Sequence, residues 1–200
     1  MRARVCALMI ILLCLTGCGG QKIDEAEQLA LDVRSKYLSM AGCTATLEVT
    51  ADYGDRIFEC VLELDHTVGG TTVLTVKEPE ILQGVAARLE NGTGFLEFDG
   101  VIVDTGSVSP EGYSPLDCVP FLLEEVRGGF ISRWGLETMG ERDCVRFATA
   151  DPSAQQGTGT ECEFWFDRGT LALLKGEVSV DGSMVLRCET DDFTWKEKEG

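Results

Sequence analysis

Cysteine is the residue type in this sequence that most readily binds metal or forms covalent cross-links. The chain has nine cysteines, of which Cys6, Cys14 and Cys18 lie near the N-terminus. The others are Cys43, Cys60, Cys118, Cys144, Cys162 and Cys188. None of these forms a Cys-x-x-Cys pair, and their spacing does not match a zinc ribbon, so no metal site is predicted.

Disulfide bonds are the second chemistry open to these residues, because an exported chain can keep them. Cys43 and Cys60 fall on predicted adjacent strands. Cys144, Cys162 and Cys188 fall on three successive strands near the C-terminus. Pairing among these five is one hypothesis, and buried free thiols acting as small hydrophobic side chains are the other. The spacing does not select one connectivity.

The remaining motifs give little support for catalysis. His66 is the one histidine, which excludes any site that needs two imidazoles. Its place beside Asp65 at a strand end predicts a surface position. The chain has no Gly-x-Ser-x-Gly elbow, no P-loop and no His-Glu-x-x-His motif. We therefore predict a protein that is not an enzyme and needs no cofactor.

One motif is a remote exception. Residues 101–107 are similar to the apolar-Asp-Thr-Gly-Ser signature of aspartic proteases. Their chemistry needs two aspartates that share a proton. This chain has one copy, so Asp104, Thr105 and Gly106 could serve only in a dimeric protease. The same tripeptide is also a good turn at the end of a strand.

The N-terminal segment predicts export and lipid attachment. Arg2 and Arg4 precede an apolar run over residues 5–15 that is too short to span a bilayer. The run ends in Leu15-Thr16-Gly17-Cys18, which resembles the bacterial lipobox. That resemblance implies removal of residues 1–17 as a signal peptide and acylation of Cys18, which holds a protein on a membrane. The alternative is an ordinary secretory signal with an incidental cysteine.

The charge balance excludes some partners and favours others. Loss of two arginines with the signal peptide takes the formal net charge from −17 to −19. Such a body lacks the clustered cations that nucleic acid requires, and anionic headgroups repel it. The acyl anchor must therefore hold it, through a tether of residues 18–23. We expect it on the outer face of the cytoplasmic membrane, or on the outer membrane of a cell that has two.

One helix and a long series of short strands account for most of the mature chain. Apolar residues recur at intervals of three and four over residues 24–41, with Asp24 and Glu27 as a capping box at the start and Gly42 as a stop. Beyond Gly42 the period becomes two. Strands are predicted over residues 44–52, 56–65, 71–76, 85–90, 94–98, 101–104, 132–138, 145–149, 161–166, 172–180 and 183–190. Asn-Gly and Asp-Gly dipeptides between them favour type I′ hairpins.

A second helix is predicted between Ser114 and Gly128, bent at Pro120. Short antiparallel strands with one apolar face make a curled sheet or barrel. The predicted fold class is α+β, mainly antiparallel β: an incomplete curled β-barrel of about ten strands with two helices packed against its concave side. Residues 24–200 form one domain, because no linker divides them.

The order of these elements, together with several short motifs, resembles the LolA/LolB-like lipoprotein-carrier superfamily. The motifs are Val76-Lys77-Glu78-Pro79, Phe98-Asp99-Gly100, the Ser114-Pro115 helix start, Phe164-Trp165-Phe166-Asp167-Arg168-Gly169-Thr170 and Asp181-Gly182. The resemblance covers nearly the whole mature chain. It implies an antiparallel barrel closed by helices, with an apolar cavity for acyl chains. The chain departs from the family at residues 171–174, where the usual proline is missing.

A cavity of that kind needs inward side chains that are apolar but do not fill the barrel. The predicted ligand-binding residues are Leu47, Val49, Phe58, Leu62, Val85, Phe95, Phe147, Phe164 and Phe166. The alternative is that these side chains form a dry core.

Two hypotheses for the function follow. In the first, the protein is a membrane-anchored, non-catalytic lipoprotein that binds an acyl chain or another hydrophobic ligand. In the second, it is an anchored protein-interaction module in the cell envelope. The resemblance extends to spore-germination lipoproteins of clostridia that bind and activate a cell-wall amidase. An acidic surface also suits a basic partner.

Overall fold

One antiparallel sheet organises the computed structural model, which describes residues 24–107, 114–155 and 157–197. Its eleven strands follow the order β6-β5-β4-β3-β2-β1-β11-β10-β9-β8-β7. The predicted signal peptide, tether and acylated Cys18 lie outside the described residues. Within the described ranges, no helix is both long enough and apolar enough to cross a membrane.

The strands match the predicted segments closely, and most of them run one to three residues further. They are β1 (Gly42–Asp52), β2 (Ile57–Thr67), β3 (Thr71–Glu78), β4 (Ala86–Glu90), β5 (Thr93–Phe98), β6 (Val101–Ser107), β7 (Ile131–Met139), β8 (Arg142–Ala150), β9 (Thr160–Asp167), β10 (Leu173–Val180) and β11 (Ser183–Lys196). Both residues of Asn91-Gly92, Asp99-Gly100 and Asp181-Gly182 have positive φ, as type I′ turns require.

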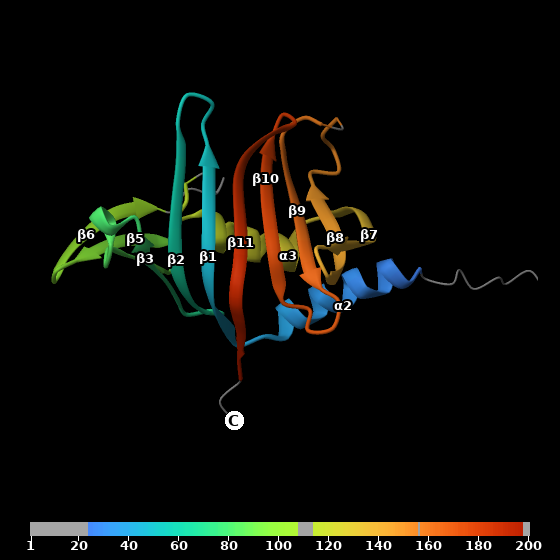
Figure 1. Ribbon diagram of the computed structural model, residues 1–200, viewed down its shortest axis with the longest axis horizontal. Coiled ribbons are helices and arrows are strands. Elements are labelled where there is room, and N and C mark those ends of the chain that lie inside the picture. The colour runs from blue at the N-terminus through green and yellow to red at the C-terminus, as the bar shows by residue number, and fades with distance from the viewer. Residues whose placement is uncertain (1–23, 108–113, 156, 198–200) are drawn as a thin grey trace, which may run out of the picture.

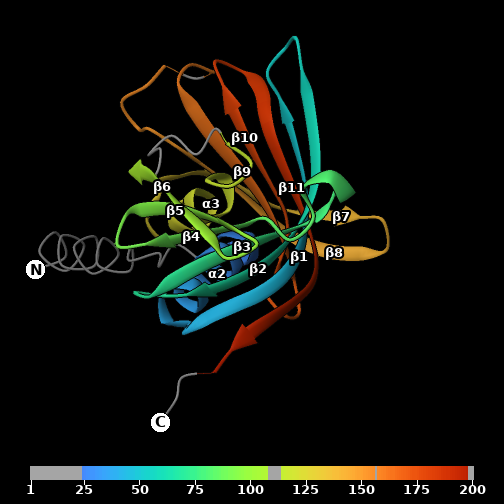
Figure 2. The same ribbon diagram turned by 90° about the vertical axis from the view of Figure 1, so that its left-hand side faces the viewer.

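Two helices lie against the concave side of this sheet. They are α2 (Glu25–Ser39) and α3 (Cys118–Gly128), and a short 3₁₀ turn, η1 (Glu80–Leu82), precedes β4. Figure 1 shows the sheet from its convex side, with both helices behind it. Figure 2 shows the curl of the sheet around them. The strands at the two ends of this order, β6 and β7, do not pair with each other, so the barrel is incomplete. The predicted fold class is confirmed.

The core lies between the helices and the concave face. Val33 and Tyr37 of α2 and Leu122 and Val126 of α3 are fully buried there. The backbone N–H of Leu173 donates to the Tyr37 hydroxyl oxygen at 2.9 Å. These contacts tie α2 to the start of β10 and place both helices over the same apolar surface.

A glycine allows α3 to lie directly on the sheet. A Cβ at Gly176 of β10 would come within 3.0 Å of Leu122 Cδ1. A side chain at this position would therefore require Leu122 to shift. The glycine lets Leu122 of α3 pack closely on β10.

Three local predictions were wrong. The second helix begins at Cys118, so Pro120 occupies its first turn, where a missing N–H breaks no helical bond, and the helix runs on to Gly128 without the predicted bend. Gly42 does not end α2. It lies in β1, where a Cβ would sit 2.1 Å from the His66 carbonyl oxygen. Asp24 is the N-cap of α2, but its side chain makes no capping bond.

Candidate functional site

The interior holds six of the nine predicted ligand-binding residues in one core. Leu47, Val49, Leu62, Phe147, Phe164 and Phe166 are all buried and belong to the same hydrophobic cluster. The Phe147 and Phe166 rings stack with centroids 5.1 Å apart, and Tyr37 of α2 meets Phe166 edge to face at 5.5 Å. These side chains contact one another and the helices, as residues of a packed core do.

The other three predicted residues lie outside this core. Val85 is half-buried at its margin, just before β4. Phe58 has the inward phase of β2, but the β1–β2 hairpin extends past the helices, so Phe58 is 48% exposed and packs on Tyr53. Phe95 pairs with Arg88, on the face opposite the buried Ala87.

The six cysteines outside the N-terminal segment are free thiols in this structure. Burial raises the pKa of the Cys43 and Cys188 thiols to about 12, so both stay protonated at neutral pH. Cys144 lies on the convex side, in a small cluster with Trp165 and Leu174. Among the described residues no group of three or more His, Cys, Asp or Glu could hold a metal ion. The five-cysteine pairing hypothesis stays a prediction.

His66 and Asp104 have structural partners. The surface position predicted for His66 is wrong, because the alternation of β2 turns it toward the concave face, where it is 7% exposed. Its Nδ1 lies 2.8 Å from Thr72 Oγ1, and burial lowers its pKa. Asp104 lies on the edge strand β6, and its Oδ1 accepts the Gly106 N–H at 2.7 Å. The turn predicted at the Asp-Thr-Gly motif is wrong, because β6 runs on to Ser107 and pairs with β5 through a register shift at this point.

The best candidate for a binding site is a surface groove that the sequence did not predict. We call it the edge groove, because it runs between α2, the end of α3 and the edge strand β7. It has a volume of about 400 Å³ and is lined by Glu27, Ala30, Leu31, Arg34, Gly128, Gly129, Phe130, Ile131 and Trp134. Leu31, Phe130 and Trp134 are 45%, 56% and 43% exposed. Large apolar side chains gathered at that exposure mark a place where something binds.

Arg34 fixes one wall of the edge groove. Its Nε donates to the Val126 carbonyl at 3.1 Å, and its Nη2 donates to the Gly129 carbonyl. The guanidinium therefore satisfies carbonyls at the C-terminal end of α3, where the helix dipole favours a cation. Burial lowers the Arg34 pKa, and the nearby Glu125 carboxylate opposes that shift. A guanidinium has five N–H donors, so Arg34 keeps donors for an oxygen-bearing ligand in the groove.

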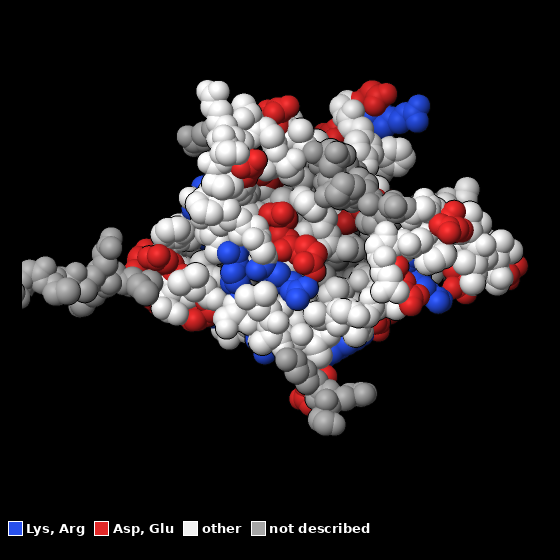
Figure 3. Space-filling view, turned by 180° about the vertical axis from the view of Figure 1, so that it is seen from behind, with Lys and Arg blue, Asp and Glu red and all other residues white. Residues whose placement is uncertain are grey.

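The face that carries the helices has charges of both signs. Figure 3 shows this face with a basic group beside an acidic one near its centre and further charged side chains toward its edges. Glu27 and Arg34 are the charged residues that line the edge groove itself.

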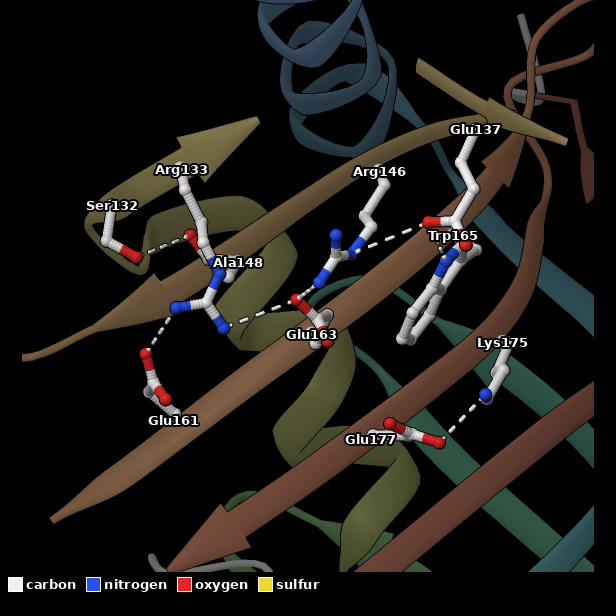
Figure 4. Close-up of polar contacts among 10 residues, drawn as sticks. All are labelled: Ser132, Arg133, Glu137, Arg146, Ala148, Glu161, Glu163, Trp165, Lys175 and Glu177. Carbon is white, nitrogen blue, oxygen red and sulfur yellow. Dashed lines mark hydrogen bonds and ion pairs between the residues drawn. The ribbon is translucent and has the colours of Figure 1, made fainter. Parts of the chain in front are cut away.

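Half of the convex face carries a balanced network of charges. Arg133 pairs with Glu161 at 2.9 Å and with Glu163 at 3.3 Å, and Arg146 pairs with Glu163 (Figure 4). Trp165 Nε1 donates to Glu137 at 3.1 Å, and Lys175 lies over the Trp165 ring. This network covers strands β7 to β10.

The other half is acidic. We call it the acidic face: Glu48, Glu59, Glu63, Asp65, Glu189 and Asp191, on β1, β2 and β11. Of these, within the part of the chain that the structure describes, Glu63 pairs with Lys77 and Asp65 with Lys196, and the other four have no ion pair. Glu48 stands directly opposite Glu189. Like charges in that position repel each other, and Lys175 of β10 stands opposite Glu189 on its other side.

Solved structures share this fold, although no protein-family model and no curated protein matches the chain. An uncharacterized conserved protein from Thermus thermophilus matches with a TM-score of 0.52 and 11% identity, over 88% of this chain and 90% of that one. A putative outer membrane lipoprotein-sorting protein domain from Vibrio parahaemolyticus matches with a TM-score of 0.47 and 12% identity, over 88% and 95%. The Mycobacterium tuberculosis lipoprotein LppX matches with a TM-score of 0.47 and 14% identity, over 88% and 95%.

At such identities the likeness is one of fold alone. The architecture implied by the resemblance to LolA/LolB-like proteins, an open antiparallel barrel with helices on its concave side, is confirmed.

Proposed function

We propose that this protein is a membrane-anchored, non-catalytic bacterial lipoprotein that binds a hydrophobic ligand in the edge groove. The observation that carries the proposal is the group of half-exposed apolar side chains, Leu31, Phe130 and Trp134, around a hollow of about 400 Å³. That volume lies in the range of small-ligand sites. The predicted interior residues pack against each other, which favours the groove over the interior as the binding place.

The anchor supports the choice of an acyl chain as the ligand. The tether of residues 18–23 reaches about 20 Å when extended, so the first turns of α2 stay close to the membrane. Those turns supply Glu27, Leu31 and Arg34 to the groove. An acyl chain that leaves the membrane can lie on the apolar side chains, while an oxygen of its head group accepts a hydrogen bond from Arg34.

The groove can be tested by fluorescence quenching with a brominated stearate. We expect the bromines to quench Trp134 when added to the full-length protein, and we expect most of the quenching to be lost in Trp134→Phe. Leu31→Asp should weaken binding at least about tenfold, because it puts a charge on the apolar wall. Leu38→Asp is the matched control, since Leu38 is also exposed on α2 but lies outside the groove. Equal effects of the two variants, or no quenching, would refute the groove.

The anchor has its own test. Cells fed radiolabelled palmitate should label the protein, and Cys18→Ser should abolish the label and move the protein out of the membrane fraction. A wild-type chain that takes up no label would show that the N-terminal segment is an ordinary secretory signal.

A second candidate function is an anchored interaction module for a basic envelope protein, such as a cell-wall amidase. The repulsive Glu48–Glu189 pair on the acidic face favours it, because a cationic partner would relieve that repulsion. A lysine-rich peptide is the first probe. Its affinity should fall with salt, and Glu48→Gln with Glu189→Gln should weaken it more than Glu137→Gln in the balanced network. Equal losses would reject this candidate.

A further inference from the structure

The edge strand β7 has a sequence that is complementary to itself when reversed. Gly135 lies at its centre. Counted outward from Gly135, the residues at equal distances are Trp134 and Leu136, Arg133 and Glu137, Ser132 and Thr138, and Ile131 and Met139. Within residues 133–137 each position thus faces a residue of matching chemistry, of opposite charge or apolar. Beyond them a bulge between Ile131 and Arg133 places Ile131 on the concave face and Met139 on the convex face, so the complementarity is confined to the centre of β7.

We propose that β7 pairs with β7 of a second copy of this chain, antiparallel, across a twofold axis at Gly135. In this arrangement a residue at a given distance before Gly135 lies opposite the residue at the same distance after it in the partner. The two sheets become one continuous sheet. The inference is independent of the proposed function, because it rests on the edge strand and not on the ligand.

From Arg133 to Glu137 the face of each side chain agrees with this register. Arg133, Gly135 and Glu137 pair with β8 residues of the convex row, and Trp134 pairs with Phe147 of the core row. On the convex side Arg133 would face the partner's Glu137, twice by symmetry. These pairs would extend the ion network of Figure 4 across the axis. Opposite charges in directly opposed positions stabilise antiparallel strands.

The concave side supplies the apolar part of the contact. Trp134 and Leu136 are both 43% exposed, because β7 is the last strand of the sheet at this edge, although α2 lies beside Trp134 on the same face. In the dimer Trp134 would lie opposite the partner's Leu136, and both would lose solvent. An aromatic side chain opposite an aliphatic one is a favourable cross-strand pair. Trp134 also lines the edge groove, so the two grooves would lie on either side of the axis.

The opposite edge of the sheet is a natural comparison. Strand β6 also exposes apolar residues, among them Ile102 and Val103. Its one charged residue is Asp104, and β6 has no basic residue to face it. Pairing of β7 with β6 of another copy would build an open filament, whereas β7 with β7 closes as a dimer. The complementarity therefore selects one edge and one closed assembly.

Cysteine cross-linking tests the axis directly in membranes that carry the full chain. Directly opposed Cα atoms lie about 4.5–5.5 Å apart, within disulfide range. A Cβ at Gly135 would meet no atom within 4 Å, so Gly135→Cys should fold normally. We expect it to give a covalent dimer on non-reducing gels, above the background of the parent chain. Ile102→Cys on β6 is the matched control and should stay at background. A yield at residue 135 that is absent, or no higher than at residue 102, would overturn the proposal.

Charge reversal tests the register. Arg133→Glu or Glu137→Arg alone should reduce the dimer yield of Gly135→Cys at least about tenfold, since each creates two repulsive pairs. The double exchange should restore it. A merely structural role of Arg133 predicts the opposite, because a glutamate introduced at position 133 would still repel Glu161 and Glu163 within one subunit. Circular dichroism of each variant confirms folding, and folded double variants that do not regain the dimer would refute this register.

Discussion

The buried thiols show how burial alone sets the chemistry of single residues. Cys43 and Cys188 lie on the concave face with almost no exposed surface, and burial raises the pKa of each thiol to about 12. An unfolded chain has no such burial, so its thiols ionise near about pH 8.5. The folded state therefore binds protons more tightly than the unfolded state between these two values.

These raised pKa values make the folded protein less stable as the pH rises. The stabilisation by these thiols is complete below about pH 8.5 and is lost as pH rises toward 12, at about 1.4 kcal/mol per pH unit for each thiol. Urea unfolding of the reduced protein between pH 7 and 10 should show this decline. A Cys43→Ala/Cys188→Ala variant, less stable at pH 7, should show a shallower slope. Parallel slopes for the two proteins would contradict the assignment.

Tyr37 offers a second prediction at a single atom. Its ring packs between Phe166 and Trp195, and its hydroxyl oxygen accepts the Leu173 N–H. Tyr37→Phe keeps the ring and removes the acceptor, which leaves a buried N–H unpaired. The free energy of unfolding should fall by about 1–3 kcal/mol in urea titrations. A change below about 0.5 kcal/mol would mean that the Leu173 N–H finds another acceptor.

At the scale of elements, the contact between α3 and β10 governs how the concave face is closed. Leu122 is fully buried above Gly176, with no room for a Cβ to be added freely. Gly176→Val should force Leu122 to shift and lower stability by about 1–3 kcal/mol. Leu122→Ala should lower it by about 2–5 kcal/mol through the cavity it leaves.

The double variant decides whether these two costs have one cause. In Gly176→Val/Leu122→Ala the new methyl groups enter the space that the leucine vacates. The combined loss should therefore be smaller than the sum of the single losses, by about 0.5–3 kcal/mol in a double-mutant cycle. Strict additivity would show that α3 does not rest on Gly176.

The elements themselves were accessible from the sequence because their signals are local. The period-two alternation after Gly42 and the Asn-Gly and Asp-Gly turns fixed almost every strand. The errors arose where a distant segment decides the outcome. Gly42 is a glycine because of the His66 carbonyl, which lies on the neighbouring strand. His66 is buried because the register of β2 turns it inward, although its neighbours in sequence are polar.

The edge groove was not predictable for the same reason. Its walls come from α2, from the residues after α3 and from β7, so no window of sequence contains it. Leu31 lies outside the apolar stripe of α2, Phe130 falls between the predicted second helix and the next predicted strand, and Trp134 fits an ordinary strand position. Their common exposure becomes visible only when the three segments meet. The interior residues, in contrast, follow alternation, and six of the nine share one core.

At the scale of the whole molecule, the convex face divides into two electrostatic halves. Strands β7 to β10 carry alternating charges that neutralise each other, and β7 leaves Arg133 and Glu137 about half-exposed at the edge. Strands β2, β1 and β11 carry the acidic face. The first half suits a second copy of the same chain, and the second suits a cationic partner. One sheet can therefore present two different contacts without overlap.

Self-repulsion within the acidic face leads to a prediction about salt. The formal net charge is −17, and the Debye length falls from about 30 Å at 0.01 M salt to about 10 Å at 0.1 M. Added salt screens the repulsion, and it weakens exposed ion pairs that contribute little. The melting temperature should therefore rise with sodium chloride. A fall would show that the ion pairs of the convex face outweigh the net charge.

Glu48 locates the source of that effect. Glu48→Lys places a cation opposite Glu189 and should raise stability at low salt by about 0.5–1 kcal/mol. Its melting temperature should also depend less on salt than that of the wild type. Glu97→Lys is the matched control, because Glu97 already pairs with Arg88 at 3.0 Å and its reversal creates a repulsive pair. If both substitutions stabilise the protein equally, the effect is one of net charge alone. If only Glu48→Lys stabilises the protein, the loss of stability from charge repulsion is localised on the acidic face, where a cationic partner would relieve it.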